Sequence, residues 1–223
     1  MNEVTRKVAE SLRPLLVENS GARAQLPSNL QETYRRFITF CDGGYTNDSF
    51  FHFFGKHGPP AHNLTSWNEP GFWKHYFGLD ETVFVFAEDI FGTQFCFDVR
   101  GTRRVVKMFI PDGGKTSLCA NTFEEFLERE ILSDRTNNEV RELASRFFNV
   151  SGERFRPLMH ISCKIPRILG GIDTDLNNLQ LIDAVVDLKI LGQITMQVRA
   201  LPPGTKIRDI RVNNQNMEVK LIV

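Results

Sequence analysis

Three carboxylates lie close together in the segment FAEDIFGTQFCFD, residues 86–98, which is otherwise rich in aromatic residues. Glu88, Asp89 and Asp98 could act as general acids or bases, as metal ligands, or as the charged tip of a hairpin. Paired catalytic carboxylates need a defined separation and unlike surroundings, so that their pKa values diverge. Glu88 and Asp89 are adjacent, and adjacent side chains of a strand point to opposite faces. We therefore predict that they end a strand at a hairpin corner, where they face solvent and can contact a partner.

Metal-ligating residue types are present, but their spacing does not form a known site. Histidines occur at positions 52, 57, 62 and 75, without an H-x-H or H-E-x-x-H pattern, and no EF-hand loop occurs. The cysteines stand singly, without a C-x-x-C pair, at positions 41, 96, 119 and 163. We therefore expect no metal site, no cofactor, and buried free thiols in a reducing compartment.

Motifs for covalent or phosphate chemistry are also missing. The sequence contains no G-x-S-x-G, and the segment PDGGKT, residues 111–116, lacks the first glycine of a phosphate-binding loop and is predicted to form a turn. Nothing in the motifs therefore favours an enzyme.

The composition of the 223-residue chain is that of an ordinary globular protein, with 41% hydrophobic and 24% charged residues. Lysine plus arginine equal aspartate plus glutamate at 27 each, so no global charge favours direct binding to nucleic acid or to an anionic membrane. No apolar run reaches the roughly 20 residues of a membrane-spanning helix. We expect a soluble cytoplasmic protein, either a monomer or a homodimer.

Helical spacing dominates the first forty residues. An opening helix that ends before the turn-prone segment ENSGA, residues 18–22, is predicted by the helical spacing of Val4, Val8, Leu12, Leu15 and Leu16. A second helix is predicted in LPSNLQETYRRFITFCDGG, residues 26–44, where Ser28 and Gln31 match a capping box. Its apolar face would consist of Leu30, Tyr34, Phe37, Ile38 and Cys41. A short strand is predicted at residues 50–54.

The connection over residues 55–79 has no sustained periodicity but is rich in aromatic residues: Trp67, Phe72, Trp73, Tyr76 and Phe77. Tryptophan and tyrosine are typical of interface hot spots, and a connection of this length also needs anchors on the sheet. The sequence favours neither interpretation over the other.

An antiparallel meander is predicted from residue 83, in the runs VFVFA, QFCFDV and RVVKMFI, with Gly101 in the second turn. A helix should follow, capped by Thr122 and Glu125, with Glu124, Glu128 and Glu130 on its wet side and Phe123, Phe126, Leu127 and Ile131 buried. Another helix is predicted over residues 138–148, and two strands about the turn NNQN, residues 213–216.

The order of these elements resembles the SUKH superfamily, which includes bacterial immunity proteins and fungal cell-wall regulators. The resemblance covers residues 26–132: Leu26-Pro27 before the helix, Gly43-Gly44 after it, the corner with Glu88, Asp89 and Gly92, and the closing segment TFEEFLERE. It implies an α+β fold with a central antiparallel sheet flanked by helices. Residues 1–150 would form this domain, and residues 151–223 a β-rich extension or small subdomain.

The resemblance also implies a function without catalysis. In bacteria, such a protein would act in competition between cells by binding and neutralising a cognate polymorphic toxin, including one that attacks nucleic acid. The alternative is a regulatory scaffold of the same fold that binds a peptide or small ligand. The residues predicted to contact the partner are Trp67, Phe72, Trp73, Tyr76, Glu88, Asp89 and Phe91.

Overall fold

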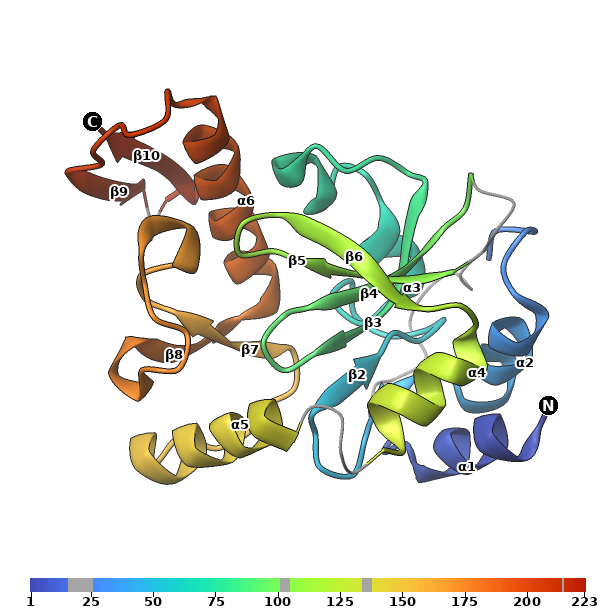
Figure 1. Ribbon diagram of the computed structural model, residues 1–223. Coiled ribbons are helices and arrows are strands. Elements are labelled where there is room, and N and C mark those ends of the chain that lie inside the picture. Colours follow the sequence, from blue (N-terminus) through green and yellow to red (C-terminus); the bar gives the residue numbers. More distant parts are fainter. Residues whose placement is uncertain (16–25, 101–104, 134–137, 214) are drawn as a thin grey trace.

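The chain forms a six-stranded antiparallel sheet that is covered by helices and joined to a C-terminal group of strands around one long helix (Figure 1). The computed structural model describes residues 1–15, 26–100, 105–133, 138–213 and 215–223. The sheet has the order β1-β2-β3-β4-β5-β6, so each strand pairs with its neighbour in sequence. The strands are β1 (Gly44–Tyr45), β2 (Phe51–Phe53), β3 (Val83–Asp89), β4 (Gln94–Asp98), β5 (Val106–Ile110) and β6 (Lys115–Ala120).

One face of the sheet is covered by the N-terminal helices and by the helix that follows β6. These are α1 (Glu3–Ser11), α2 (Glu32–Cys41), α4 (Phe123–Phe126) and the short π-helix η2 (Leu127–Ile131). Tyr34 of α2 packs against Phe86 and Phe97 of the sheet, with ring centroids 5.4 and 5.3 Å away. The sheet residues prefer strands because aromatic and β-branched side chains pack well on a pleated surface, as they do in this core.

The other face is covered by the connection between β2 and β3. This connection contains α3 (Leu64–Asn68) and the 3-10 helix η1 (Lys74–Phe77). Asn63 begins α3 by accepting hydrogen bonds from the backbone N–H groups of Thr65 and Ser66. Trp67 and Trp73 are fully buried, and the Trp73 ring packs against Phe77 and Phe109.

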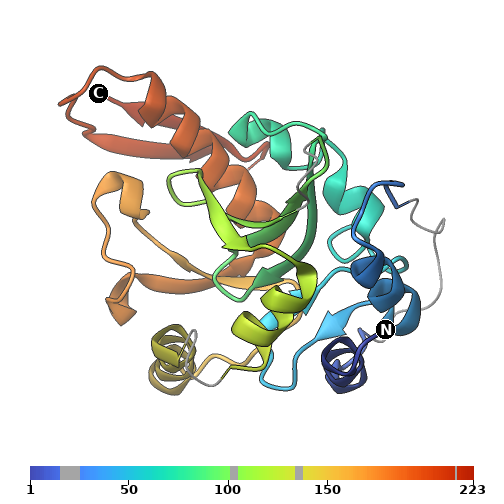
Figure 2. The same cartoon turned by 45° about the vertical axis from the view of Figure 1, so that its right-hand side comes forward.

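The C-terminal part consists of two hairpins and two helices. Its elements are α5 (Asn138–Ser151), β7 (Met159–Cys163), the 3-10 turns η3 (Arg167–Leu169) and η4 (Leu176–Asn178), β8 (Leu179–Asp183), α6 (Ala184–Ala200), β9 (Asp209–Asn213) and β10 (Glu218–Ile222). Helix α6 runs alongside the sheet, and α5 lies below the C-terminal strands (Figure 2). A Cβ on Gly192 of α6 would lie 2.5 Å from the Tyr76 side chain, so glycine allows α6 to pack closely on η1.

The α+β class, the central antiparallel sheet and the C-terminal hairpin about residues 213–216 are confirmed. The buried positions Tyr34, Phe37 and Ile38 are confirmed as well. Residue 101 lies outside the described residues. The division at residue 150 stays a prediction.

Three local predictions are wrong or incomplete. Gln31 precedes α2 without capping it, because its side chain instead accepts a hydrogen bond from the Phe123 N–H. Glu130 is buried, not on the wet side of its helix. Neither β6 nor α6 is among the predicted elements. None of the helices in the described part of the chain is long and apolar enough to cross a membrane.

Candidate functional site

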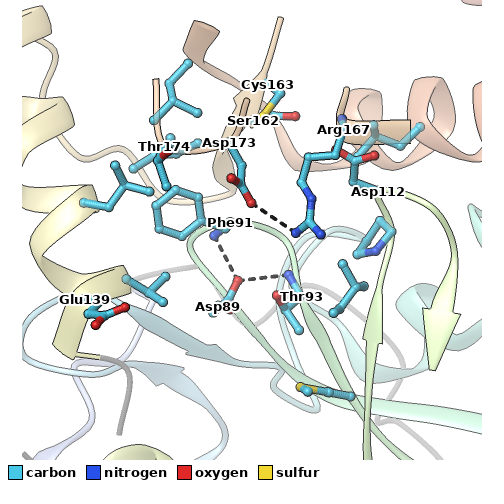
Figure 3. A pocket seen from close by; sticks show the side chains of 18 of the residues that line it. Asp89, Phe91, Thr93, Asp112, Glu139, Ser162, Cys163, Arg167, Asp173 and Thr174 are labelled. Atoms are coloured by element: carbon cyan, nitrogen blue, oxygen red, sulfur yellow. Dashed lines mark hydrogen bonds and ion pairs between the residues drawn. The ribbon is translucent and has the colours of Figure 1, made fainter. Parts of the chain in front are cut away.

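A pocket of about 650 Å³ opens where the C-terminal part meets the sheet. Its walls come from the β3–β4 hairpin, the ends of β5 and η2, helix α5, strand β7 and one residue of α6. Figure 3 shows Asp89, Phe91 and Thr93 of the hairpin on one side and Ser162 and Cys163 of β7 on the other. The backbone N–H of Ile161 in β7 donates to the Ile90 carbonyl at 2.8 Å, which fixes the distance between these two walls.

The wall of the pocket combines apolar side chains with a surplus of acids. Two arginines, Arg146 and Arg167, lie among six carboxylates: Asp89, Asp112, Glu130, Glu139, Glu142 and Asp173. Arg167 pairs with Asp173 at 3.1 Å (Figure 3). Large apolar side chains, among them Phe91, Phe95, Met108, Leu143 and Leu191, cover the wall between the charges. The pocket can therefore bind a group that is apolar along its length and positively charged at one end.

Asp89 ends β3 inside this pocket. Its Oδ1 accepts the backbone N–H groups of Phe91 and Thr93, both at 2.9 Å, which closes the turn before β4 (Figure 3). Burial raises the pKa of Asp89 to about 6, although the hydrogen bonds from Thr93 and Phe91 act in the opposite direction. Asp89 is thus a carboxylate at neutral pH and becomes protonated in mildly acidic solution.

The neighbouring Glu88 points to the other face and is the centre of a buried polar network. Its Oε1 accepts from His52 Nδ1 at 2.9 Å, and its Oε2 accepts from Gln94 Nε2 at 2.8 Å and from His160 Nε2 at 3.1 Å. Gln94 in turn accepts the indole N–H of Trp67 at 2.9 Å. The network therefore connects the β2–β3 connection, three strands of the sheet and the C-terminal part.

His160 joins the C-terminal part to the sheet. Its Nδ1 lies 3.0 Å from Asp187 Oδ2 on α6, while its Nε2 faces Glu88, so both ring nitrogens donate to carboxylates. The imidazole packs on Gly92, where φ is +81° and a Cβ would lie 2.7 Å from Nδ1. Only glycine combines this backbone conformation with so close an approach.

The charges of the network follow from its geometry. Burial disfavours ionisation of Glu88, but attraction and hydrogen bonds from His160 and His52 outweigh it and lower its pKa to about 2. For His160, burial disfavours the cation, yet Glu88 and Asp187 raise its pKa to about 10. His62, whose Nδ1 lies 2.7 Å from His52 Nε2, has a pKa lowered to about 3 by burial and by His52. The site therefore holds a buried imidazolium between two carboxylates, beside a neutral His62.

This ion pair predicts a pH dependence of stability. The folded pKa of His160 lies above its usual value of 6.5, so its contribution is complete below that value and is lost as the pH rises towards 10. We expect the stability advantage of the wild type over His160→Gln to shrink by up to about 1.4 kcal/mol per pH unit between about pH 7 and 9. Chemical denaturation of both proteins across this range measures the difference, in which shared titrations such as that of Lys74 cancel. Parallel curves would contradict the charged state of His160.

The predicted partner-binding residues have different surroundings in the structure. Asp89 and Phe91 line the pocket, and their contact with a partner stays a prediction. Glu88 is only 3% exposed, so the expectation that its carboxylate faces solvent is wrong: Glu88 and Asp89 point to opposite faces, and the C-terminal part covers Glu88. Trp67 and Trp73 are fully buried and act as anchors of the connection on the sheet, whereas Phe72 and Tyr76 are half-buried. Asp98 pairs with Lys107 at 2.8 Å.

Three of the four clustered histidines make two separate local contacts, and the ring of the fourth, His75, packs against that of Tyr76. His52 and His62 are stacked within the network, while His57 Nδ1 lies 2.7 Å from the Asp42 carboxylate. Within the described ranges, no group of three or more histidine, cysteine, aspartate or glutamate side chains is arranged to hold a metal ion.

The contribution of the C-terminal part to the site is not evident in the sequence. His160 and Asp187 lie 72 and 99 positions after Glu88, and no motif joins them. The acids of α5 follow an ordinary amphipathic pattern, in which exposed charges are the rule. Only the position of a histidine in the apolar run MHIS, residues 159–162, indicates a buried polar partner.

Comparison with known proteins assigns the first part of the chain to a family. Residues 20–129 match the model of the SMI1 / KNR4 family (SUKH-1). Among solved structures, the chain is similar to Atu4351 from Agrobacterium tumefaciens, with 15% identity, a TM-score of 0.49, and coverage of 74% of this chain and 76% of that one. No curated protein matches the sequence significantly.

Proposed function

Because this chain belongs to the SUKH superfamily, we propose that it is a non-catalytic, protein-binding immunity factor that neutralises a cognate toxin by covering it. The observation that carries the proposal is the pocket of about 650 Å³ with apolar walls and six carboxylates. Such a combination suits a protein surface that presents apolar and basic side chains together.

Local charge complementarity supports a toxin as the partner. Proteins that act on nucleic acid carry basic surfaces because they must neutralise phosphates. Lysine plus arginine equal aspartate plus glutamate in this chain, so the chain as a whole does not imitate the charge of a nucleic acid. The proposal needs only a local acidic surface that faces the toxin. Asp89 and Phe91, both at the hairpin corner, are the proposed contacts, because both line the pocket and both are among the partner-binding residues that the sequence predicts.

The second candidate is a regulatory scaffold that binds a peptide or small ligand. The volume of the pocket favours it, since pockets for small molecules have about 300–1,000 Å³. A gene for a toxin next to the gene for this chain would favour the immunity function, and its absence the scaffold.

Co-expression tests the immunity function directly. The tagged chain is produced together with the product of the adjacent gene, and the purified material is analysed by mass spectrometry and by size. We expect a complex of fixed stoichiometry, together with growth of cells that the neighbouring protein alone would arrest. Recovery of this chain alone, with growth still arrested, would overturn the immunity function and favour the scaffold.

A further inference from the structure

We propose that the pocket binds a basic side chain, arginine or lysine, which a segment of the partner protein presents next to an apolar residue. This inference rests on the proposed function and specifies the chemistry by which the partner is recognised. It assigns a role to the C-terminal part, whose strand β7 and helices α5 and α6 supply walls that the six-stranded sheet alone lacks.

The charge of the occupant follows from the acids that have no cationic partner among the residues that the structure describes. The negative charge of Asp173 is offset by its ion pair with Arg167. The Asp112 carboxylate accepts hydrogen bonds from the backbone N–H groups of Arg167 and Ile168, at 2.6 and 3.1 Å. On α5, Glu139 and Glu142 are exposed at the rim, and neither forms an ion pair with a residue in the described part of the chain.

Arg146, one turn beyond Glu142, offsets part of this negative charge. Asp89 adds a carboxylate from a second wall of the pocket, the β3–β4 hairpin, and lies to the right of Glu139 of α5 in Figure 3. A cation between these walls would therefore be attracted from two sides, whereas a phosphate or carboxylate would be repelled.

The shape of the pocket specifies a long side chain in place of a small cation. The methylene stem of arginine or lysine can pack on Leu143 and Leu191 while its charged end reaches the rim. Phe91 is half-buried in the wall, so the edge or face of its ring is accessible to a guanidinium group, which stacks favourably on aromatic rings. The remaining apolar wall, including Met108, suits an apolar neighbour of that residue.

A pair of blocked tripeptides tests the inference without knowledge of the partner. Acetyl-Leu-Arg-Leu-amide carries the proposed side chain, and the same peptide with citrulline is a neutral control of nearly equal shape. In nuclear magnetic resonance titrations of the full chain, we expect the arginine peptide to shift backbone amides at residues 89–93 and 161–163, with an affinity about tenfold higher than that of the citrulline peptide. Equal shifts with both peptides would indicate an apolar or neutral-ligand site, and shifts elsewhere another surface; both results would overturn the inference.

A matched pair of variants tests the rim. Glu139→Gln combined with Glu142→Gln should weaken the arginine peptide about five- to tenfold. Glu10→Gln combined with Glu81→Gln, which removes two exposed carboxylates outside the pocket, should leave its affinity unchanged. An equal effect of the two double variants would show that only the overall charge matters and would contradict the inference.

The two proposals can fail separately. If the co-expressed toxin binds the wild type and the Glu139→Gln/Glu142→Gln variant equally well, the pocket is not the recognition site, but the immunity function stands. If the arginine peptide binds in the pocket while no toxin is recovered, the site stands and the immunity function fails.

Discussion

Replacing Glu88 by glutamine is expected to lower the free energy of unfolding by about 3–5 kcal/mol, the usual loss when one partner of a buried ion pair is removed. Glu88 accepts hydrogen bonds from His52, Gln94 and His160, and its carboxylate balances the charge of the buried His160 imidazolium. Glutamine has a similar shape but no charge. The variant therefore leaves His160 with Asp187 alone, or forces it to lose its proton.

Urea denaturation at neutral pH measures this loss. Glu10→Gln is the control, because Glu10 is exposed on α1, and we expect a change below about 0.5 kcal/mol. A change of the same small size in Glu88→Gln would contradict the buried network and restore the exposed hairpin corner that the sequence predicts.

Replacing Trp67 by alanine should cost about 3–5 kcal/mol of stability, as for other large aromatic side chains removed from a core. The Trp67 ring is fully buried and stacks on Phe54 with a centroid distance of 4.6 Å. Its indole N–H also donates to Gln94, so the variant leaves a buried amide oxygen without that donor. Thermal and urea unfolding report the loss.

The matched control for Trp67→Ala is Phe40→Ala, because Phe40 is an aromatic residue that is 56% exposed. We expect Phe40→Ala to change the stability by less than about 0.5 kcal/mol. If Trp67→Ala instead unfolds like the wild type but binds the partner less well, the anchoring role is wrong and Trp67 belongs to the interface.

The sequence predicts strands β2 to β5 of the sheet because their residues follow a local pattern of aromatic and β-branched side chains. Val83, Phe84, Val85 and Phe86 prefer strands whatever covers them, and the asparagine-rich turn before β10 needs no long-range partner. The second helix is predicted for the same reason, since one apolar stripe with Tyr34 and Phe37 faces the sheet. Where local preference and tertiary packing agree, pattern alone is sufficient.

The missed features depend on contacts between distant segments. Helix α6 is rich in β-branched residues and lacks a clear polar face, so periodicity does not distinguish it from a strand; Asp183 caps it and Gly192 docks it on η1. The burial of Glu88 also depends on a contact with a distant segment. A lone acid in an apolar strand is costly, which favours an exposed carboxylate. His160, 72 positions later, removes that cost together with His52 and Gln94, and no local pattern indicates these partners.

The central claim is neutralisation by binding, and the stoichiometry of inhibition tests it most directly. The purified chain is added in steps to the purified partner toxin, and the remaining toxic activity is measured at concentrations well above the dissociation constant. Occlusion predicts a linear fall of activity that reaches zero at a fixed molar ratio of the complex, with activity restored when the complex is dissociated. Complete inhibition at a small fraction of one equivalent would mean that the chain inactivates the toxin catalytically, and no inhibition at excess would mean that it is not an immunity factor.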